Sequence, residues 1–451
     1  MSDIIAAIAT GRAPCAIGIL RLSGPGCAAL TGRVFTPKEP FADAPDRRLV
    51  LGLLHDRQGR VIDECLGVVC RAPHSYTGEE TVELQCHGSP AMLAAGLEAL
   101  LAAGARQAGP GEFTRRAFLN GKLDLTQAEA VVDLIDAETA DAAANAAGQL
   151  GGALKRAIEP VYDGLTDLCS HFHAVLDYPD EDIEDFGAAE LSGALDRAGT
   201  ALQELLATYE KGRHLRQGVR AVLLGKPNAG KSSLLNRLAG YDRVIVTDIA
   251  GTTRDTVEEP VRVGRVLLRL TDTAGIREAG DAIEALGVAR SEQAAREAEL
   301  ALFVCDASQP LTDEDRRAIE AAKCAPRSLA LCNKSDLPAA VSPDELPFDT
   351  VLTVSARTGA GLDALPALLE GWFLGENACD GSLLTNPRQF GALDRASSAI
   401  ERAKTGLCLG VTPDAVLTDV EEAMAALGEV TGRTVREDIT NRIFERFCVG
   451  K

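Results

Sequence analysis

The chain has 451 residues, of which 46% are hydrophobic and 25% are charged. This length exceeds what a single hydrophobic core usually organises, so several domains are predicted. The 46 basic and 66 acidic residues give a net charge of -20 and only 4% of residues are aromatic, which argues against a broad basic or base-stacking surface for nucleic acid.

The twelve cysteines are scattered along the chain and form no C-x-x-C pair. With no secretory signal ahead of them, we expect reduced thiols in a cytoplasmic protein rather than a disulfide framework. No window approaches the roughly 18 consecutive apolar residues of a membrane-spanning helix, so no membrane segment is expected.

Residues 1–120 combine short apolar segments with glycine and proline turns. Segments 16–22 and 81–86 are predicted strands, and the second alternates between apolar and polar side chains, with Glu83 on the polar face. A helix is predicted over 90–103. The first part of the chain is therefore predicted to be an α+β domain.

The hydrophobic pattern then changes to a helical period. Thr126 and Glu129 are predicted to form a capping box, and an alanine-rich helical pattern runs over 126–177. The end of the chain is helical again. The two helical parts, taken as 121–216 and 379–451, are predicted to belong to one all-α domain.

Residues 217–378 alternate strands and helices, as a doubly wound parallel sheet does. Strands are predicted over 219–224, 265–270, 329–332 and 351–354. The simplest architecture inserts this α/β domain between the two parts of the helical domain.

A phosphate-binding loop follows the first of these strands, where residues 225–233 read GKPNAGKSS. Gly225 and Gly230 allow backbone N–H groups to close around phosphate oxygens. Lys231 is predicted to reach the outer phosphates, and the Ser232 hydroxyl is predicted to bind magnesium.

Three further motifs follow in the order of a guanine-nucleotide site. Asp272 begins DTAG and is predicted to act on magnesium through water, with Gly275 near the terminal phosphate. Asp336 ends NKSD and can accept two hydrogen bonds from guanine that adenine does not offer. Residues 355–357, SAR, provide a backbone contact to the base oxygen. Together the four motifs predict GTP binding.

The residue after Gly275 is Ile276, whereas Ras-type GTPases carry there the glutamine that orients the attacking water. Isoleucine can neither orient nor polarise water, so hydrolysis requires another acid or base. Glu284 is the candidate catalytic residue. The alternative is that Glu284 only caps or decorates the following helix.

The segment 247–255, TDIAGTTRD, is predicted to loop over the phosphates. Its carbonyls and the Asn228 side-chain oxygen would form a cage for a monovalent cation in the role of an arginine finger. Thr253 is predicted to bind magnesium, and Arg254 as the finger itself is the competing interpretation. The complete set of predicted GTP-binding residues is Asn228, Ala229, Gly230, Lys231, Ser232, Ser233, Thr247, Asp248, Ile249, Ala250, Gly251, Thr252, Thr253, Asp272, Thr273, Ala274, Gly275, Asn333, Lys334, Asp336, Ser355, Ala356 and Arg357.

Several stretches together resemble one family, the tRNA uridine-5-carboxymethylaminomethyl modification GTPases, or MnmE family. They are GILRLSG, SYTGEETVELQCHG, PGEFTRRAFLNGKLDLTQAEAVVDLIDA, GKPNAGKSSLLN, TDIAGTTRD, DTAGIRE and the terminal FCVGK. Many GTPases share the phosphate-loop and DTAG pieces. The PGEF-to-LIDA stretch and the terminal Cys-x-Gly-Lys are much more specific and carry the resemblance.

The resemblance implies a homodimeric, potassium-dependent GTPase. Its N-terminal domain, at 1–120, would bind folate and dimerise, and its G domain would be inserted in the helical domain. Potassium would be held by Asn228 and the carbonyls of Thr247, Ile249 and Thr252, and magnesium by Ser232 and Thr253. Glu284 would position the water.

The resemblance also implies folate contacts from Arg21, Glu83, Lys122 and Lys451. Cys448, in the terminal motif, would serve chemistry, with a buried or structural thiol as the alternative.

Such GTPases act with an FAD-dependent partner of the MnmG family, in a heterotetramer or larger assembly. Together they add a carboxymethylaminomethyl or aminomethyl group to carbon 5 of the wobble uridine of certain tRNAs. A tetrahydrofolate derivative, 5-formyl or 5,10-methylene, supplies one carbon, and glycine or ammonium supplies the amine. The acidic composition predicts that the partner holds most of the tRNA, and the lack of a convincing G-x-G-x-x-G after a strand places FAD on the partner.

Two other functions remain open from the residues alone. A potassium-activated ribosome-assembly switch GTPase would share the isoleucine-type switch, but it gives no role to the first 120 residues or the terminal motif. A scaffold that binds GTP without turning it over is disfavoured by Glu284 and the segment 247–255.

Overall fold

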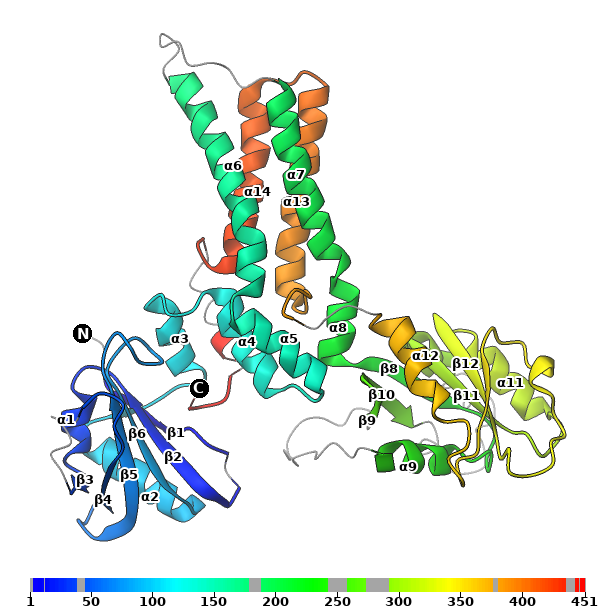
Figure 1. Ribbon diagram of the computed structural model, residues 1–451, viewed down its shortest axis with the longest axis horizontal. Helices are drawn as coiled ribbons and strands as arrows, with labels where there is room; N and C mark the ends of the chain where they lie inside the picture. Colours follow the sequence, from blue (N-terminus) through cyan, green and yellow to red (C-terminus); the bar gives the residue numbers. More distant parts are fainter. Residues whose placement is uncertain are drawn as a thin grey trace. The chain divides into compact units, whose positions relative to one another are not determined.

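The computed structural model describes residues 3–11, 13–38, 45–177, 188–241, 258–272, 292–375, 380–434, 443–445 and 447–450. Its contacts divide the chain into two compact units, and Figure 1 labels most of their elements. Unit 1 comprises Met1–Val132, Leu150–Phe186 and Thr405–Lys451, and unit 2 comprises Asp133–Gln149 and Gly187–Lys404.

The described part of unit 1 contains a seven-stranded sheet in the order β3-β4-β5-β6-β2-β1-β7. The strands are β1 (Ile5–Ile8), β2 (Cys15–Ser23), β3 (Phe35–Pro37), β4 (Val50–His55), β5 (Val61–Cys70), β6 (Thr81–Gly88) and β7 (Arg106–Gln107). Helix α2 (Pro90–Ala102) packs on one face, over a core that includes Leu20, Leu84 and Leu100. The α+β character predicted for this part of the chain is confirmed.

The predicted strands 16–22 and 81–86 are confirmed as β2 and β6, which pair antiparallel. In β6, Val82 and Leu84 are fully buried and face α2, whereas Glu83 lies on the opposite face. The predicted helix over 90–103 is α2. Strict alternation of side chains thus identified a strand with one face in the core under α2.

The other helices of unit 1 lie between the strands of the sheet or follow them in the sequence. They are α1 (Cys27–Thr31), α3 (Glu112–Leu119), α4 (Leu125–Ile135, which continues into unit 2), α6 (Ala153–Asp177) and α14 (Pro413–Thr431). The helical run predicted over 126–177 is divided into α4, α5 (Ala140–Leu150) and α6. Gly152, with a φ of 82°, separates α5 from α6, because such a backbone conformation favours glycine and ends a helix.

The capping box predicted at Thr126 and Glu129 is wrong. The reciprocal pair is Asp124 with Gln127: the Gln127 N–H donates to Asp124 Oδ1 at 2.9 Å, and the Asp124 N–H donates to Gln127 Oε1 at 3.0 Å. Aspartate caps a helix at least as well as threonine, so α4 begins at the earlier site.

The described part of unit 2 contains a six-stranded sheet in the order β13-β12-β11-β8-β10-β9. The strands are β8 (Val219–Leu224), β9 (Glu258–Val263), β10 (Val266–Asp272), β11 (Leu300–Asp306), β12 (Arg327–Asn333) and β13 (Val351–Thr353). Only the β9–β10 pair is antiparallel among these neighbours. All four strands predicted from the sequence are confirmed.

Helices cover both faces of this sheet. Leu234 of α9 (Lys231–Tyr241) and Leu365 of α12 (Ala364–Phe373) share one core. Ile319 of α11 (Asp313–Ala322) packs into a separate core with alternate residues of the same strands, such as Phe303 and Cys305. This two-faced burial is that of a doubly wound α/β domain, as predicted.

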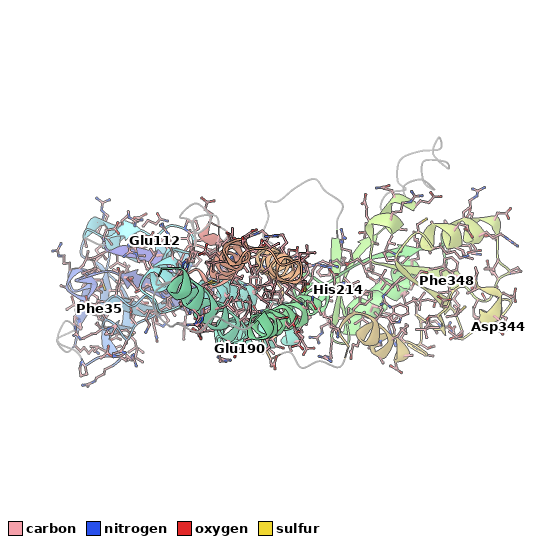
Figure 2. All side chains as sticks on the ribbon, turned by 90° about the horizontal axis from the view of Figure 1, so that it is seen from above. Phe35, Glu112, Glu190, His214, Asp344 and Phe348 are labelled. Atoms are coloured by element: carbon pink, nitrogen blue, oxygen red, sulfur yellow. The ribbon has the colours of Figure 1, made fainter. Side chains whose placement is uncertain are left out.

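The remaining elements of unit 2 are helical. They are α5, α7 (Ala188–Ala207), α8 (Tyr209–Gln217), α13 (Pro387–Cys408) and the short 3-10 helix η2 (Pro343–Glu345). The end of α8 is attached to the sheet, because His214 (Figure 2) contacts the Glu299 carboxylate at 3.1 Å, just before β11. Arg269 of β10 also forms an ion pair with Glu138, between α4 and α5, at 2.5 Å.

No helix within the described ranges combines the length and apolar character that crossing a membrane requires. The predicted domain limits 1–120, 121–216, 217–378 and 379–451 remain predictions.

Candidate functional site

The phosphate loop, residues 225–233, connects the end of β8 to α9 and depends on two glycines. Gly225 has a φ of 145°, and a Cβ there would overlap the Val304 carbonyl oxygen of β11. Gly230 has a φ of 96°, and a Cβ there would overlap Asn333 Nδ2. Both positions therefore require glycine for backbone conformation and for space.

Lys231 is the first residue of α9, and its amine lies among the carbonyls of the loop. Its Nζ donates to Gly225 O at 2.6 Å and to Lys226 O at 2.9 Å. Ser232 and Ser233 are exposed beside it, and so is Asn228, which has a φ of 64°. The loop, its lysine and the start of a helix thus lie together, as anion binding requires.

Asn333, at the end of β12, connects three of the predicted motifs. Its Nδ2 donates to Ala229 O at 2.9 Å, and its Oδ1 accepts from the Ala356 N–H at 2.9 Å. The asparagine is 2% exposed. The phosphate loop, NKSD and SAR segments therefore form one site.

Lys334 is held by Asp306, an acidic residue outside the predicted nucleotide motifs. Its Nζ lies 2.6 Å from Asp306 Oδ2, at the end of β11. Burial raises the pKa of Asp306, but the hydrogen bonds from Lys334 and Ser308 outweigh burial, and the pKa falls below its usual range. A charged pair therefore fixes the direction of Lys334 beside the base-recognition motif.

Asp336 has a polar partner on each carboxylate oxygen. The Ser355 hydroxyl donates to Oδ1 at 2.5 Å, and Arg357 Nη2 lies 2.7 Å from Oδ2. The hydrogen bond from Ser355 lowers the pKa of Asp336. Asp336 is therefore ionised at neutral pH, the state in which it can accept two N–H groups from guanine.

β10 leads to the DTAG motif. Its register places Asp272 beside Leu223 on β8, two residues before Gly225. Because parallel strands end at the same sheet edge, the Asp272 backbone lies next to the phosphate loop. The other predicted residues of this half of the site lie outside the described residues: Thr247, Asp248, Ile249, Ala250, Gly251, Thr252, Thr253, Arg254, Thr273, Ala274, Gly275 and Glu284.

The N-terminal domain brings together a second group of predicted residues. Arg21 on β2 and Glu83 on β6 are register partners, and Arg21 Nε lies 2.8 Å from Glu83 Oε1. The Arg21 guanidinium also lies over the rings of Tyr76 and Phe113, at 5.6 and 5.7 Å from their centroids. The Arg21 guanidinium, the Glu83 carboxylate and the two aromatic rings therefore form one cluster.

The C-terminal segment, residues 447–450, contacts the Arg21 cluster and the start of α3. Arg21 Nη1 donates to Gly450 O at 3.4 Å, and the Gly111 N–H donates to Cys448 O at 3.3 Å. Cys448 is exposed, so its thiol is not buried, and the choice between a chemical and a structural role stays a prediction. Lys451 lies outside the described residues.

Lys122 lies against the loop that carries Tyr76. A Cβ on Gly78 would lie 3.1 Å from Lys122 Cγ. The loop is also held by α3, because the Tyr76 hydroxyl lies 2.8 Å from Thr114 Oγ1 and Asn120 Nδ2 donates to Thr77 O at 2.8 Å.

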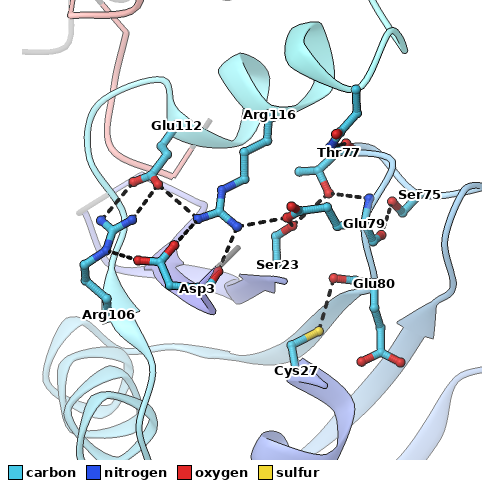
Figure 3. A network of polar contacts seen from close by, with 11 residues as sticks. Asp3, Ser23, Cys27, Ser75, Thr77, Glu79, Glu80, Arg106, Glu112 and Arg116 are labelled. Carbon is cyan, nitrogen blue, oxygen red and sulfur yellow. Dashed lines mark hydrogen bonds and ion pairs between the residues drawn. The ribbon is translucent and has the colours of Figure 1, made fainter. Parts of the chain in front are cut away.

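Arg116 of α3 is the centre of the polar network beneath this loop (Figure 3). Its Nη1 donates to Glu79 Oε2 at 2.9 Å and to Asp3 O at 2.8 Å, and its Nη2 lies 3.2 Å from Glu112. Glu79 in turn accepts from the Ser23 hydroxyl at 3.1 Å. The SYTGEE and PGEF motifs, which are distant in the sequence, are therefore two sides of one network.

The phosphate loop, the asparagine that joins it to the base-recognition segments and the doubly wound sheet define a P-loop GTPase domain. The family model of the MnmE helical domain matches residues 125–448, and the model of the GTP-binding protein TrmE N-terminus matches residues 4–122. The chain belongs to the tRNA modification GTPase MnmE family.

Curated relatives span the whole chain. The tRNA modification GTPase MnmE of Roseiflexus sp. is 45% identical over 465 residues, covering 100% of this chain and 99% of that protein. The protein of the same name from Roseiflexus castenholzii is 44% identical over 466 residues, with the same coverage. A solved structure, the G domain of the T. maritima FeoB iron transporter, aligns with 33% of this chain and 94% of its own at 22% identity and a TM-score of 0.25.

Proposed function

We propose that this chain hydrolyses GTP in a system that adds a carboxymethylaminomethyl or aminomethyl group to carbon 5 of the wobble uridine of certain tRNAs. The observation that carries the GTPase assignment is the double contact of Asn333, with Ala229 of the phosphate loop and Ala356 of the base-recognition segment. The purified protein should release phosphate from GTP and not from ATP, and equal rates with both nucleotides would contradict the assignment.

Magnesium is proposed to be held by Ser232 and Thr253, and potassium by Asn228 with the carbonyls of Thr247, Ile249 and Thr252. The described residues fit these ions, because Ser232 and Asn228 present exposed oxygen-bearing side chains beside Lys231. Bound potassium would supply positive charge near the transferred phosphate.

Glu284 is proposed to position the attacking water, because Ile276 has no polar group with which to do so. Exchange of Glu284 for alanine should then slow turnover while nucleotide affinity is kept. Unchanged turnover would assign the role to another residue.

A tetrahydrofolate derivative, 5-formyl or 5,10-methylene, is proposed to bind at the Arg21–Glu83 pair, with Lys122 and Lys451 as further proposed contacts. The chemistry of the cluster supports this ligand. Folates carry a pterin ring with N–H donors, which suits the 28% exposed Glu83 carboxylate and the nearby aromatic rings. Their glutamate carboxylates suit the cationic side chains. Cys448 is exposed on the segment that ends at this cluster, and a chemical role for it is part of the proposal.

A homodimer formed through the N-terminal domain is proposed as the working state. The sheet face opposite α2 supports this proposal, because Ile17 and Leu51 are 62% and 36% exposed there, and Leu51 pairs with Leu66 on the same face. Contiguous exposed apolar surface is typical of subunit contacts.

An FAD-dependent partner of the MnmG family is proposed to complete the system and to hold most of the tRNA, because this chain has a net charge of -20. The ribosome-assembly alternative gives no role to the contacts of the C-terminal segment with Arg21 and Gly111. A cytoplasmic location is proposed with this function.

A further inference from the structure

The second residue of the phosphate loop, Lys226, is held by a residue outside all the nucleotide motifs. Its Nζ lies 2.8 Å from Asp315 Oδ2, in the first turn of α11. The two side chains are 11% and 1% exposed. The phosphate loop is therefore joined to α11, which Figure 1 shows beside β11 and β12, through a buried ion pair.

The acidic partner is itself fixed in place. Asp315 Oδ2 also accepts from the Thr312 N–H at 2.9 Å and from the Thr312 hydroxyl at 2.7 Å, in the capping box that begins α11. Its other oxygen, Oδ1, is buried without a hydrogen-bond partner among the residues that the structure describes. The Asp315 carboxylate is thus a rigid acceptor whose charge is balanced by Lys226.

Lys226 also affects the residue that binds phosphate. The Lys226 carbonyl accepts from Lys231 Nζ at 2.9 Å and from the Ala229 N–H at 3.4 Å. Any movement of Lys226 would therefore move an acceptor of the Lys231 amine and the backbone that precedes Gly230.

We propose that the Lys226–Asp315 ion pair positions the phosphate loop for nucleotide binding. Asn333 holds the loop at Ala229 O from the base side, and Asp315 holds it at Lys226 from the α11 side. The backbone N–H groups and Lys231 are then oriented for the phosphates before the nucleotide arrives, which lowers the ordering cost of binding. Both are positioning residues, because neither is placed to touch the reacting atoms.

A purely structural role is the competing explanation. Buried ion pairs often give little net stability compared with apolar pairs of the same size, so stability alone is a weak reason for this one. The test must therefore separate the affinity for nucleotide from the stability of the nucleotide-free protein.

The experiment uses the full-length double variant Lys226→Met/Asp315→Asn, which removes both charges together and keeps a polar side chain at the helix start. Affinity is measured with a fluorescent GDP analogue, and thermal unfolding is measured on nucleotide-free protein. Affinity should fall by about 10-fold or more, as for a misplaced binding group, while the unfolding midpoint is kept. The single variant Lys226→Arg should keep affinity close to that of the wild type, because it keeps the charge.

The matched control is Arg316→Met/Asp313→Asn. This pair lies on the same helix turn at 4.0 Å but is 73% and 94% exposed, and should leave affinity unchanged. Unchanged affinity in Lys226→Met/Asp315→Asn would overturn the proposal. A fall in affinity that accompanies a matching fall in the unfolding midpoint would also overturn it, in favour of a structural role.

Discussion

Asn333 Nδ2 donates a hydrogen bond to the carbonyl oxygen of Ala229 across 2.9 Å, over a separation of 104 residues in the sequence. The oxygen of the same side chain accepts from the Ala356 N–H. Phosphate recognition and base recognition are therefore coupled through one buried amide, and the geometry of each half depends on the other.

Exchange of Asn333 for alanine should weaken GDP binding by roughly 10- to 100-fold. The Ala229 carbonyl and the Ala356 N–H would lose their partner, and each unpaired buried group costs about 1–3 kcal/mol. Fluorescence titration with a GDP analogue measures the effect. Ser335→Ala is the control, since the Ser335 hydroxyl makes no hydrogen bond within the described part of the chain, and an equal loss in both variants would contradict the coupling.

GTP hydrolysis should be at least several-fold faster in potassium chloride than in sodium chloride at equal ionic strength. The reason is that the oxygen ligands of the proposed cage would select the bound cation by its size. Asn228→Ala should remove most of this difference, since it deletes one of the ligands. Phosphate release measures both effects. Equal rates in the two salts would remove the cage from the account and leave GTP binding intact.

Exchange of Arg21 for glutamine should weaken binding of 5-formyltetrahydrofolate by about 10-fold, the scale of a lost charge-assisted contact, while GTP affinity is kept. Titration calorimetry measures both ligands. Arg60→Gln is the matched control, because Arg60 is an arginine of the same domain that is 77% exposed and paired with Asp56. Wild-type folate affinity in Arg21→Gln would exclude this cluster as the folate site.

Glu299 should make the stability of unit 2 depend on pH. Burial raises the pKa of Glu299, but hydrogen bonds from His214 and Arg213 outweigh burial and lower the pKa to about 2. Because the folded pKa is depressed, the stabilisation is complete above the unfolded pKa and is lost as pH falls from about 4.5 toward about 2. The full contribution is of the order of 3 kcal/mol.

The measurement for Glu299 is urea unfolding of the wild type and Glu299→Gln between about pH 6 and pH 3. The difference in free energy of unfolding should shrink as pH falls. Glu210→Gln is the control, because Glu210 also binds Arg213 but is 68% exposed. A difference that stays constant with pH would show that ionisation of Glu299 is not its source.

Local patterns explain which features could be predicted from the sequence. Alternation predicted β6, and apolar runs predicted β8 and β12, because side-chain period and burial are local properties. The nucleotide motifs were predicted for a related reason, since each is a short segment at a strand end.

Long-range partners could not be predicted in the same way. Nothing near Lys226 in the sequence indicates Asp315, because the pair forms only after β11 and α11 have packed beside the loop. The capping site of α4 was misplaced because Asp124 and Thr126 are both good caps, and local pattern does not choose between them. The network of Arg116 with Glu79 likewise depends on packing of α3 against a distant loop.

GTP turnover by this chain is proposed to serve modification of the wobble uridine. The most direct measurement is a mass-spectrometric census of tRNA nucleosides from cells that lack the chain, restored with wild type or with Glu284→Ala. We expect loss of 5-carboxymethylaminomethyl and 5-aminomethyl uridines, recovery with wild type and little recovery with the variant. An unchanged census in cells without the chain and without a second copy would contradict it.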